Sequence, residues 1–99
     1  MQKLFTVKAK IWLYPGKAGW NFVTIPPDVT KEIDFYHAHQ KRGWGSLPVH
    51  VTIGKTTWET SIFPDKKSSS YLLPMKKAML VKTSLKEGDM CKLSLEIRQ

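Results

Sequence analysis

The sequence predicts an all-β fold with two short helices, in which residues 1–99 form a single small closed barrel. Three observations support this fold. At least five short segments alternate apolar and polar residues, as strands with one buried face do. Two of those segments end at prolines that lead directly into helical spacing. A chain of 99 residues suits one domain, and closing its short strands into a barrel removes exposed sheet edges.

The first strand is the most regular of the predicted strands. Its apolar side chains recur at every second position, at Phe5, Val7, Ala9, Ile11 and Leu13. A loop over residues 14–19 leads to a second strand over 20–25. Aromatic residues of the strands are expected to fill the core rather than to line a cofactor site: Trp12, Trp20, Phe22, Trp58 and Phe63. Trp20, Phe22 and Trp58 are predicted to point inward, whereas Trp12 breaks the alternation and is predicted to be exposed.

Each predicted helix follows a strand directly, with proline at the corner. Pro26-Pro27 ends the second strand, and helical spacing then runs over residues 29–40. In the C-terminal half, a short strand over 71–73 ends at Pro74, and a second helix is predicted over 75–82. This order of strand, proline and helix is a weak internal repeat in architecture, without a match in residue identity.

Gly54-Lys55 is predicted to be the two-residue turn of a hairpin, because such turns require the positive φ that glycine adopts. In this register Val51 faces Trp58, and His50 faces Glu59 on the other side of the sheet. A four-residue loop would place His50 opposite Ser61 instead. The last strand is predicted to point its apolar residues inward, namely Cys91, Leu93, Leu95 and Ile97.

A glycine-flanked turn after the first helix is the leading candidate for a ligand site. It contains Arg42, Gly43, Trp44, Gly45 and Ser46. Loops are exposed, so Trp44 can stack on a planar ligand while Arg42 pairs with an anion, and Ser46 and Ser61 add hydroxyl groups. The alternative is that Gly43 caps the helix and Trp44 closes the end of the barrel.

Catalysis and metal binding have weaker support in the sequence. A serine nucleophile at Ser61 would need a base and a group that orients it, and only His50 and Glu59 lie near it in the sequence. His37 and His39 are two residues apart on a predicted helix and therefore face different directions. We assign no catalytic residue, no metal ligand and no cofactor.

The formal net charge of +8 indicates attraction to polyanions, and a second candidate function follows from it. Only Arg42 and Arg98 are arginine, so the forked contacts that recognise phosphates and base edges are scarce. Lysines give weak, salt-sensitive attraction instead. The candidate polyanion site contains lysines of the last third of the chain: Lys66, Lys67, Lys76, Lys77 and Lys82. The alternative is an ordinary solvated lysine surface.

Cysteine content and hydropathy favour a cytoplasmic location. Cys91 has no second cysteine with which to form a disulfide and is expected to be inert core. No apolar run approaches the roughly 20 residues of a membrane span. The N-terminal segment alternates polar and apolar residues, unlike a signal peptide. We therefore expect no membrane partner.

The chain resembles the bacterial domain-of-unknown-function family 1905. The resemblance follows the chain in order through Gly19-Trp20-Asn21-Phe22-Val23, Ile25-Pro26, the stretch RGWGS at 42–46 with Val49, Thr52-Ile53-Gly54, Trp58, Thr60-Ser61-Ile62-Phe63-Pro64, Leu73-Pro74 and Gly88-Asp89. It implies a small double-split β-barrel. Residues 73–96 are also similar to one half of the AbrB-type swapped-hairpin DNA-binding barrel, which needs two chains to close. This chain is predicted to hold both halves and to be a monomer.

These observations favour a non-enzymatic binding module whose partner is a small molecule or anion held at the Gly-Trp-Gly turn. The alternative is weak, salt-dependent binding of nucleic acid or another polyanion through the lysine-rich C-terminal third.

Overall fold

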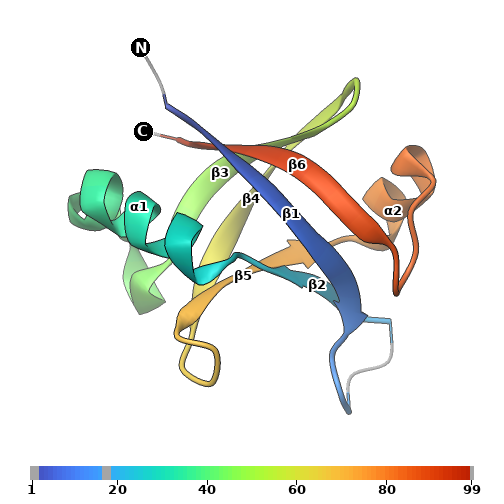
Figure 1. Cartoon of the computed structure of the whole chain (residues 1–99), viewed down its shortest axis with the longest axis horizontal. Coiled ribbons are helices and arrows are strands. Elements are labelled where there is room, and N and C mark those ends of the chain that lie inside the picture. Colours follow the sequence, from blue (N-terminus) through green and yellow to red (C-terminus); the bar gives the residue numbers. More distant parts are fainter. Residues whose placement is uncertain (1–2, 17–18, 99) are drawn as a thin grey trace.

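The computed structural model describes residues 3–16 and 19–98, and six strands form a closed barrel in the order β1-β2-β5-β4-β3-β6. The prediction of a closed, all-β barrel with two short helices is confirmed (Figure 1). Residues 17–18 of the predicted loop over 14–19 lie outside the described residues. The strands are β1 (Leu4–Leu13), β2 (Asn21–Thr24), β3 (Leu47–Ile53), β4 (Thr56–Asp65), β5 (Ser70–Met75) and β6 (Met90–Ile97).

Two ten-residue strands, β1 and β4, close the barrel because each pairs with different neighbours along its length. The first part of β1 pairs with β6, from Leu4 opposite Glu96 onward, and its last three residues pair with β2. Similarly, β4 pairs with β3 as far as Ile62 and then with β5 from Phe63 to Asp65. The barrel is therefore made of two sheets that share these long strands.

The hairpin between β3 and β4 has the predicted two-residue turn. Gly54 has a φ of +58°, the left-handed conformation that favours glycine. Val51 pairs with Trp58, and His50 pairs with Glu59. The two-residue alternative is therefore confirmed, and His50 does not lie opposite Ser61.

Alternating side chains of all six strands fill the barrel, together with Ile33 and Leu80 from the two helices. The buried apolar residues are Phe5, Val7, Ile11, Val23, Ile25, Ile33, Leu47, Val49, Val51, Ile62, Tyr71, Leu73, Met75, Leu80, Cys91, Leu93, Leu95 and Ile97. The predicted inward face of β6 is confirmed, and Cys91 is buried within it.

The helices lie at opposite ends of the barrel (Figure 1). Helix α1 (Pro27–His37) begins at a proline, whose missing N–H is not needed in a first turn, and buries Ile33. A short 3₁₀ turn over 38–40 follows it, so the predicted helix is longer than the α-helical part. Helix α2 (Lys77–Thr83) begins later than predicted, because Met75 is still a strand residue buried in the core.

Strands β4 and β5 diverge from the loop that joins them, and this divergence positions the groove described below (Figure 1). Their described pairing covers three residue pairs, the last of which joins Phe63 to Leu72. Pro74, further along β5, pairs with Phe22 of β2. Proline has no N–H to offer a second partner, which fits the end of the β4–β5 ladder. The prediction that Pro74 ends the strand was wrong, because β5 continues to Met75.

Candidate functional site

The Gly-Trp-Gly turn is a self-contained loop between α1 and β3. The Arg42 N–H donates to the Ser46 carbonyl at 2.7 Å, and the Gly45 N–H donates to the Arg42 carbonyl at 2.9 Å. The Ser46 hydroxyl donates to the Gly43 carbonyl at 3.1 Å. The Ser46 hydroxyl therefore has a structural role in the turn.

Trp44 lies at the tip of this turn, with 95% of its surface exposed. Its φ of +66° is unusual for a non-glycine residue. Gly45 also has a positive φ, and a Cβ there would lie 3.2 Å from Pro64, so the turn fits closely against β4. The alternative in which Trp44 closes the end of the barrel was wrong, because its side chain lies in solvent.

The structure brings Arg42, Trp44 and Ser46 together in one turn but places Ser61 on the barrel wall. Ser61 pairs with Pro48 of β3, and its neighbours Thr60 and Ile62 belong to the face that points inward. The two hollows described below are lined by other residues. A ligand role for these four residues therefore stays a prediction.

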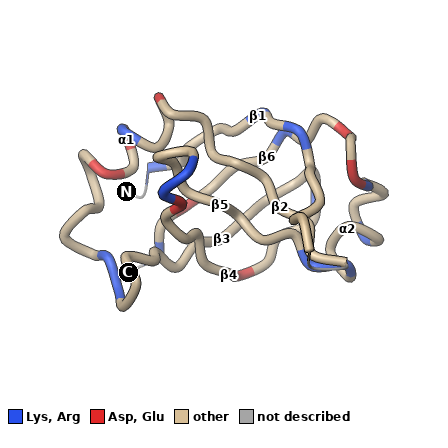
Figure 2. Tube along the Cα trace, turned by 90° about the horizontal axis from the view of Figure 1, so that it is seen from below, with Lys and Arg blue, Asp and Glu red and all other residues tan. Residues whose placement is uncertain are grey.

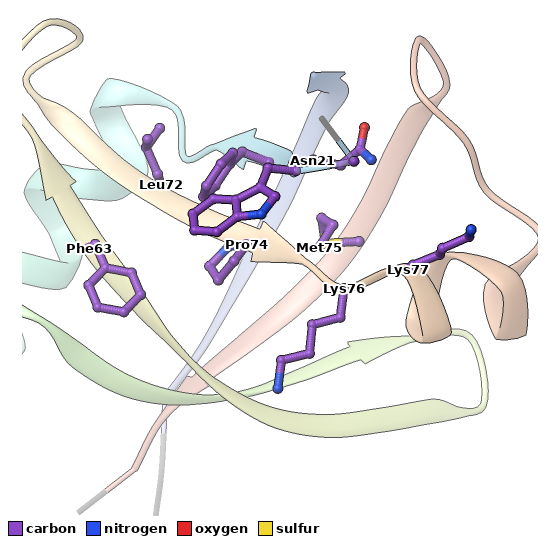
Figure 3. Close-up of a pocket in the computed structure, with 10 residues that line it drawn as sticks. Asn21, Phe63, Leu72, Pro74, Met75, Lys76 and Lys77 are labelled. Carbon is purple, nitrogen blue, oxygen red and sulfur yellow. The ribbon is translucent and has the colours of Figure 1, made fainter. Parts of the chain in front are cut away.

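An open apolar groove of about 610 Å³ lies where β4 and β5 diverge. Strand β2, the preceding loop, β4, β5 and the start of α2 contribute its lining: Gly19, Trp20, Asn21, Phe22, Phe63, Leu72, Pro74, Met75, Lys76 and Lys77. Figure 3 shows Phe63 on β4 and Pro74 on β5 at opposite sides of this groove, and Leu72 pairs with Phe63 where the two strands still meet.

Aromatic side chains that the sequence assigns to the core lie at this groove instead. Trp20 is 57% exposed and Phe63 is 44% exposed, so the prediction that they fill the core was wrong. Phe22 is half-buried, and its ring lies 6.4 Å from that of Trp20 and 5.5 Å from that of Trp12. Trp12 itself is half-buried and donates its indole N–H to the Thr24 hydroxyl at 2.9 Å.

Two lysines give the groove its charge. Lys76 and Lys77 line it, and no acidic residue belongs to its described lining. Lys76 is the extended residue between β5 and α2, whereas Lys77 is the first residue of the helix. In Figure 3 the Lys76 side chain extends past Pro74 on the side of β4, and the Lys77 side chain points along α2, away from Phe63. Within the part of the chain that is described, neither ammonium group forms an ion pair.

A smaller hollow of about 140 Å³ lies between α1 and the β4–β5 loop. The Tyr71 hydroxyl donates to Asp34 at 2.5 Å, and the Lys41 ammonium lies 3.3 Å from the same carboxylate. Burial raises the pKa of Tyr71 well above its ordinary value, with a further contribution from Asp34. Tyr71 is therefore a neutral hydrogen-bond donor that connects β5 to α1.

A charged cluster on the barrel wall contains His50, Glu59, Glu96 and Arg98. The His50 Nε2 lies 2.9 Å from Glu59, and its Nδ1 lies 3.3 Å from Glu96. The hydrogen bond with Glu59, then that with Glu96, raises the pKa of His50. The hydrogen bond with His50, then the charge of Arg98, lowers the pKa of Glu59. Both ring nitrogens are engaged by carboxylates, so His50 is not positioned as a base for Ser61.

The predicted polyanion residues fall into two groups rather than one patch. Lys66 and Lys67 follow β4 in the loop to β5, whereas Lys76, Lys77 and Lys82 lie at or within α2. Figures 1 and 2 place this loop and α2 well apart along the long axis of the molecule. Polyanion binding through these lysines stays a prediction.

His37 at the end of α1 and His39 in the following 3₁₀ turn lie in different surroundings. His37 is buried, and its Nδ1 lies 2.5 Å from the Gln40 side-chain oxygen, whereas His39 is exposed. Within residues 3–16 and 19–98, no three side chains of the His, Cys, Asp or Glu type gather as metal ligands would. None of the described helices combines the length and the apolar character needed to cross a membrane.

A comparison with known protein families identifies the family of this chain. The model of the family described as "Domain of unknown function (DUF1905)" matches residues 8–95. The chain belongs to this family. The match covers the Gly-Trp-Gly turn and the whole described lining of the apolar groove. No curated protein matches the chain.

The groove is the site that reasoning from the sequence missed. The sequence nevertheless contains a signal for it, because apolar residues occupy both the odd and the even positions of two strands. Ile62 and Phe63 are consecutive in β4. In a regular strand, only one of two consecutive side chains can face the core of the barrel. In β2, Phe22 precedes the buried Val23 and therefore points to the opposite face of the strand. Apolar residues at both odd and even positions indicate a strand with two apolar faces. In this structure, the second apolar face lines the groove.

Proposed function

We propose that this DUF1905 domain is a non-enzymatic binding module and that its ligand site is the apolar groove between β4 and β5. The observation that carries the proposal is a hollow of about 610 Å³ lined by exposed aromatic side chains. This volume lies within the range of roughly 300–1,000 Å³ for small-molecule sites, which are mostly apolar with a few polar groups. Exposed apolar surface of this kind is typical of binding sites.

The groove wall is preorganised for an apolar ligand. Trp12, Trp20 and Tyr14 all have ring centroids within 6.4 Å of Phe22. Such packing restricts the side chains before a ligand arrives, which reduces the entropy lost on binding. Pro74 adds a rigid surface opposite Phe63.

Side-chain chemistry also favours binding over catalysis. The ring of His50 is held by two carboxylates on the outer wall. Cys91 is buried, and burial raises the pKa of its thiol, which disfavours the nucleophilic thiolate. The lining of the groove contains no carboxylate, histidine or cysteine among its described residues.

Titration with 2-naphthalenemethanol, followed by NMR, tests the proposal. We expect shifts at the Trp20 indole and at the Leu72 and Met75 methyl groups, and we expect Phe63→Ser to weaken binding about tenfold, because a large aromatic contact is lost. Phe35→Ser is the matched control, since Phe35 is 82% exposed on α1 and does not line the groove. Shifts confined to other surfaces, or equal weakening by both variants, would contradict the proposal.

The Gly-Trp-Gly turn is a second candidate for the ligand site of the binding module. Trp44 combines almost complete exposure with a left-handed conformation, and folding alone explains neither. Trp44→Ala should leave the fold intact and remove any ligand-induced shifts at the turn amides. If no ligand in a broad NMR screen shifts these amides in the unaltered protein, the turn is excluded.

A further inference from the structure

We infer that the groove binds an apolar carboxylate, with its apolar body on the aromatic and proline surface and its carboxylate at Lys76. This inference rests on the proposed function and identifies the class of its ligand. It follows from the charge, direction and surroundings of the two lysines at the groove.

The charge of the groove selects an anion. Lys76 and Lys77 are the charged residues of its described lining, and both are exposed without an ion-pair partner among the described residues. A carboxylate at this end would be attracted by the lysine ammonium groups, whereas a cation would be repelled by them. The net charge of +8 adds a long-range attraction for anions.

The directions of the two lysines limit the ligand to one negative charge at one place. Only the Lys76 side chain extends past Pro74 on the side of β4, because Lys76 retains the extended conformation of the strand. Lys77 has entered the helix and points away. No arginine lines the groove, so the forked contact that suits a phosphate group is missing from its described lining. One lysine balances one carboxylate.

The rest of the groove suits the apolar body of such a molecule. Phe63, Leu72 and Pro74 lie on the side of the groove away from α2. Trp20 and Phe22 add aromatic side chains to the lining. Burying apolar ligand surface there is favourable by about 25 cal/mol per Å². An amphipathic molecule satisfies both ends of the groove at once, which neither a neutral hydrocarbon nor a small inorganic anion does.

Two matched pairs of compounds test the inference by isothermal titration calorimetry and NMR. The first pair is 2-naphthoate and 2-naphthalenemethanol, and the second is decanoate and decanol, so each carboxylate has a neutral partner with the same body. We expect each carboxylate to bind about fivefold more tightly than its alcohol at low salt. This advantage should shrink as salt is raised, because salt screens an exposed charge pair. Tighter binding of the naphthyl pair would assign an aromatic body, and tighter binding of the decyl pair an acyl chain.

Lys76→Gln and Lys77→Gln provide the matched variants. Lys76→Gln should weaken carboxylate binding about fivefold and leave the alcohols unchanged, whereas Lys77→Gln should change neither. Equal affinity of carboxylates and alcohols would overturn the inference and leave the proposed function standing. Equal weakening by the two variants would overturn the assignment to Lys76. If no compound of either kind binds at the groove, the proposed function itself fails.

Discussion

Trp44 is the residue whose conformation folding explains least. A left-handed φ costs a non-glycine residue roughly 1–2 kcal/mol, and exposing a large indole forgoes the favourable burial of its surface. The turn forms through backbone hydrogen bonds between Arg42, Gly45 and Ser46, none of which needs an indole at position 44. A glycine would suit the backbone better, so the presence of tryptophan favours a role for its side chain outside the fold.

Replacing Trp44 tests this conformational cost directly. Trp44→Gly should raise the free energy of unfolding by about 0.5–1 kcal/mol relative to Trp44→Ala, because glycine removes the left-handed penalty that alanine retains. Chemical denaturation of both variants measures the difference. If alanine proves as stable as glycine, the turn does not hold residue 44 in a strained conformation.

At the scale of elements, the charged cluster joins β3, β4 and β6 on the outer wall. His50 on β3 lies between Glu59 on β4 and Glu96 on β6, and Arg98 adds a contact to Glu59 at 3.4 Å. All of these groups are at least partly exposed, so the cluster modulates stability rather than determining the fold. Its distinctive property is a dependence on pH.

The sign of that dependence follows from the two pKa shifts. The pKa of His50 is raised from 6.5, so its contribution is complete below that pH and is lost as pH rises through the higher folded value. The pKa of Glu59 is lowered from 4.5, so its contribution is present above that pH and is lost on acidification through the lower folded value. The cluster should therefore stabilise the barrel most between pH 4.5 and 6.5.

Thermal unfolding between pH 5 and 9 checks this expectation. The melting temperature of the unaltered protein should fall more steeply across the folded pKa of His50 than that of His50→Gln. His39→Gln, at an exposed position outside the cluster, should keep the steeper dependence. Parallel curves for all three proteins would contradict a contribution from the cluster.

A second link between elements holds α1 against β5. The Tyr71 hydroxyl donates to Asp34 of α1, while the ring of Tyr71 is buried in the core. Tyr71→Phe should therefore lower the free energy of unfolding by about 1–2 kcal/mol, because Asp34 loses a donor and the ring is retained. Tyr14→Phe is the control, since Tyr14 is 40% exposed and directly follows β1. Equal losses in the two variants would show that the link to Asp34 is not the cause.

The sequence predicts the elements of this chain better than the directions of its side chains. The hairpin register follows from Gly54, and the start of α1 from Pro27, because turn and helix-start chemistry are local. The direction of Trp20 and Phe63 depends on where the two sheets separate, which is set by pairing partners distant in the sequence. The alternation of residues shows that a strand has two faces. When both faces are apolar, it does not show which of them points to the core and which is exposed.

At the scale of the whole molecule, the groove is a consequence of how the barrel closes. Strands β1 and β4 each belong to two sheets, and β4 pairs with β5 only from Phe63 to Asp65, so the part of β4 before Phe63 diverges from β5. Pro74 lies on the β5 side of the resulting divergence, and exposed aromatic residues line it. Composition and periodicity predict the barrel, but a hollow between two diverging strands requires the three-dimensional pairing.

The distribution of charge over the whole molecule leads to a final prediction about polyanions. The β4–β5 loop carries Lys66 and Lys67, and α2 with the residue before it carries Lys76, Lys77 and Lys82. Figures 1 and 2 place these segments well apart along the long axis of the molecule, and salt at physiological concentration screens exposed charges over roughly 8 Å. We therefore predict that the two groups act as independent weak sites rather than as one patch.

Binding of mixed-sequence DNA at several salt concentrations distinguishes two independent weak sites from a single patch. Each double variant, Lys66→Gln with Lys67→Gln or Lys76→Gln with Lys77→Gln, should lower the affinity by a similar factor. Each should also reduce the slope of log affinity against log salt by less than two, because only a fraction of the bound DNA contacts either group. A single recognition patch predicts a different result, in which one double variant removes nearly all binding and the other has no effect. That result would restore the lysine-rich surface as a specific polyanion site, whereas equal and partial losses would assign the attraction to the net charge of +8.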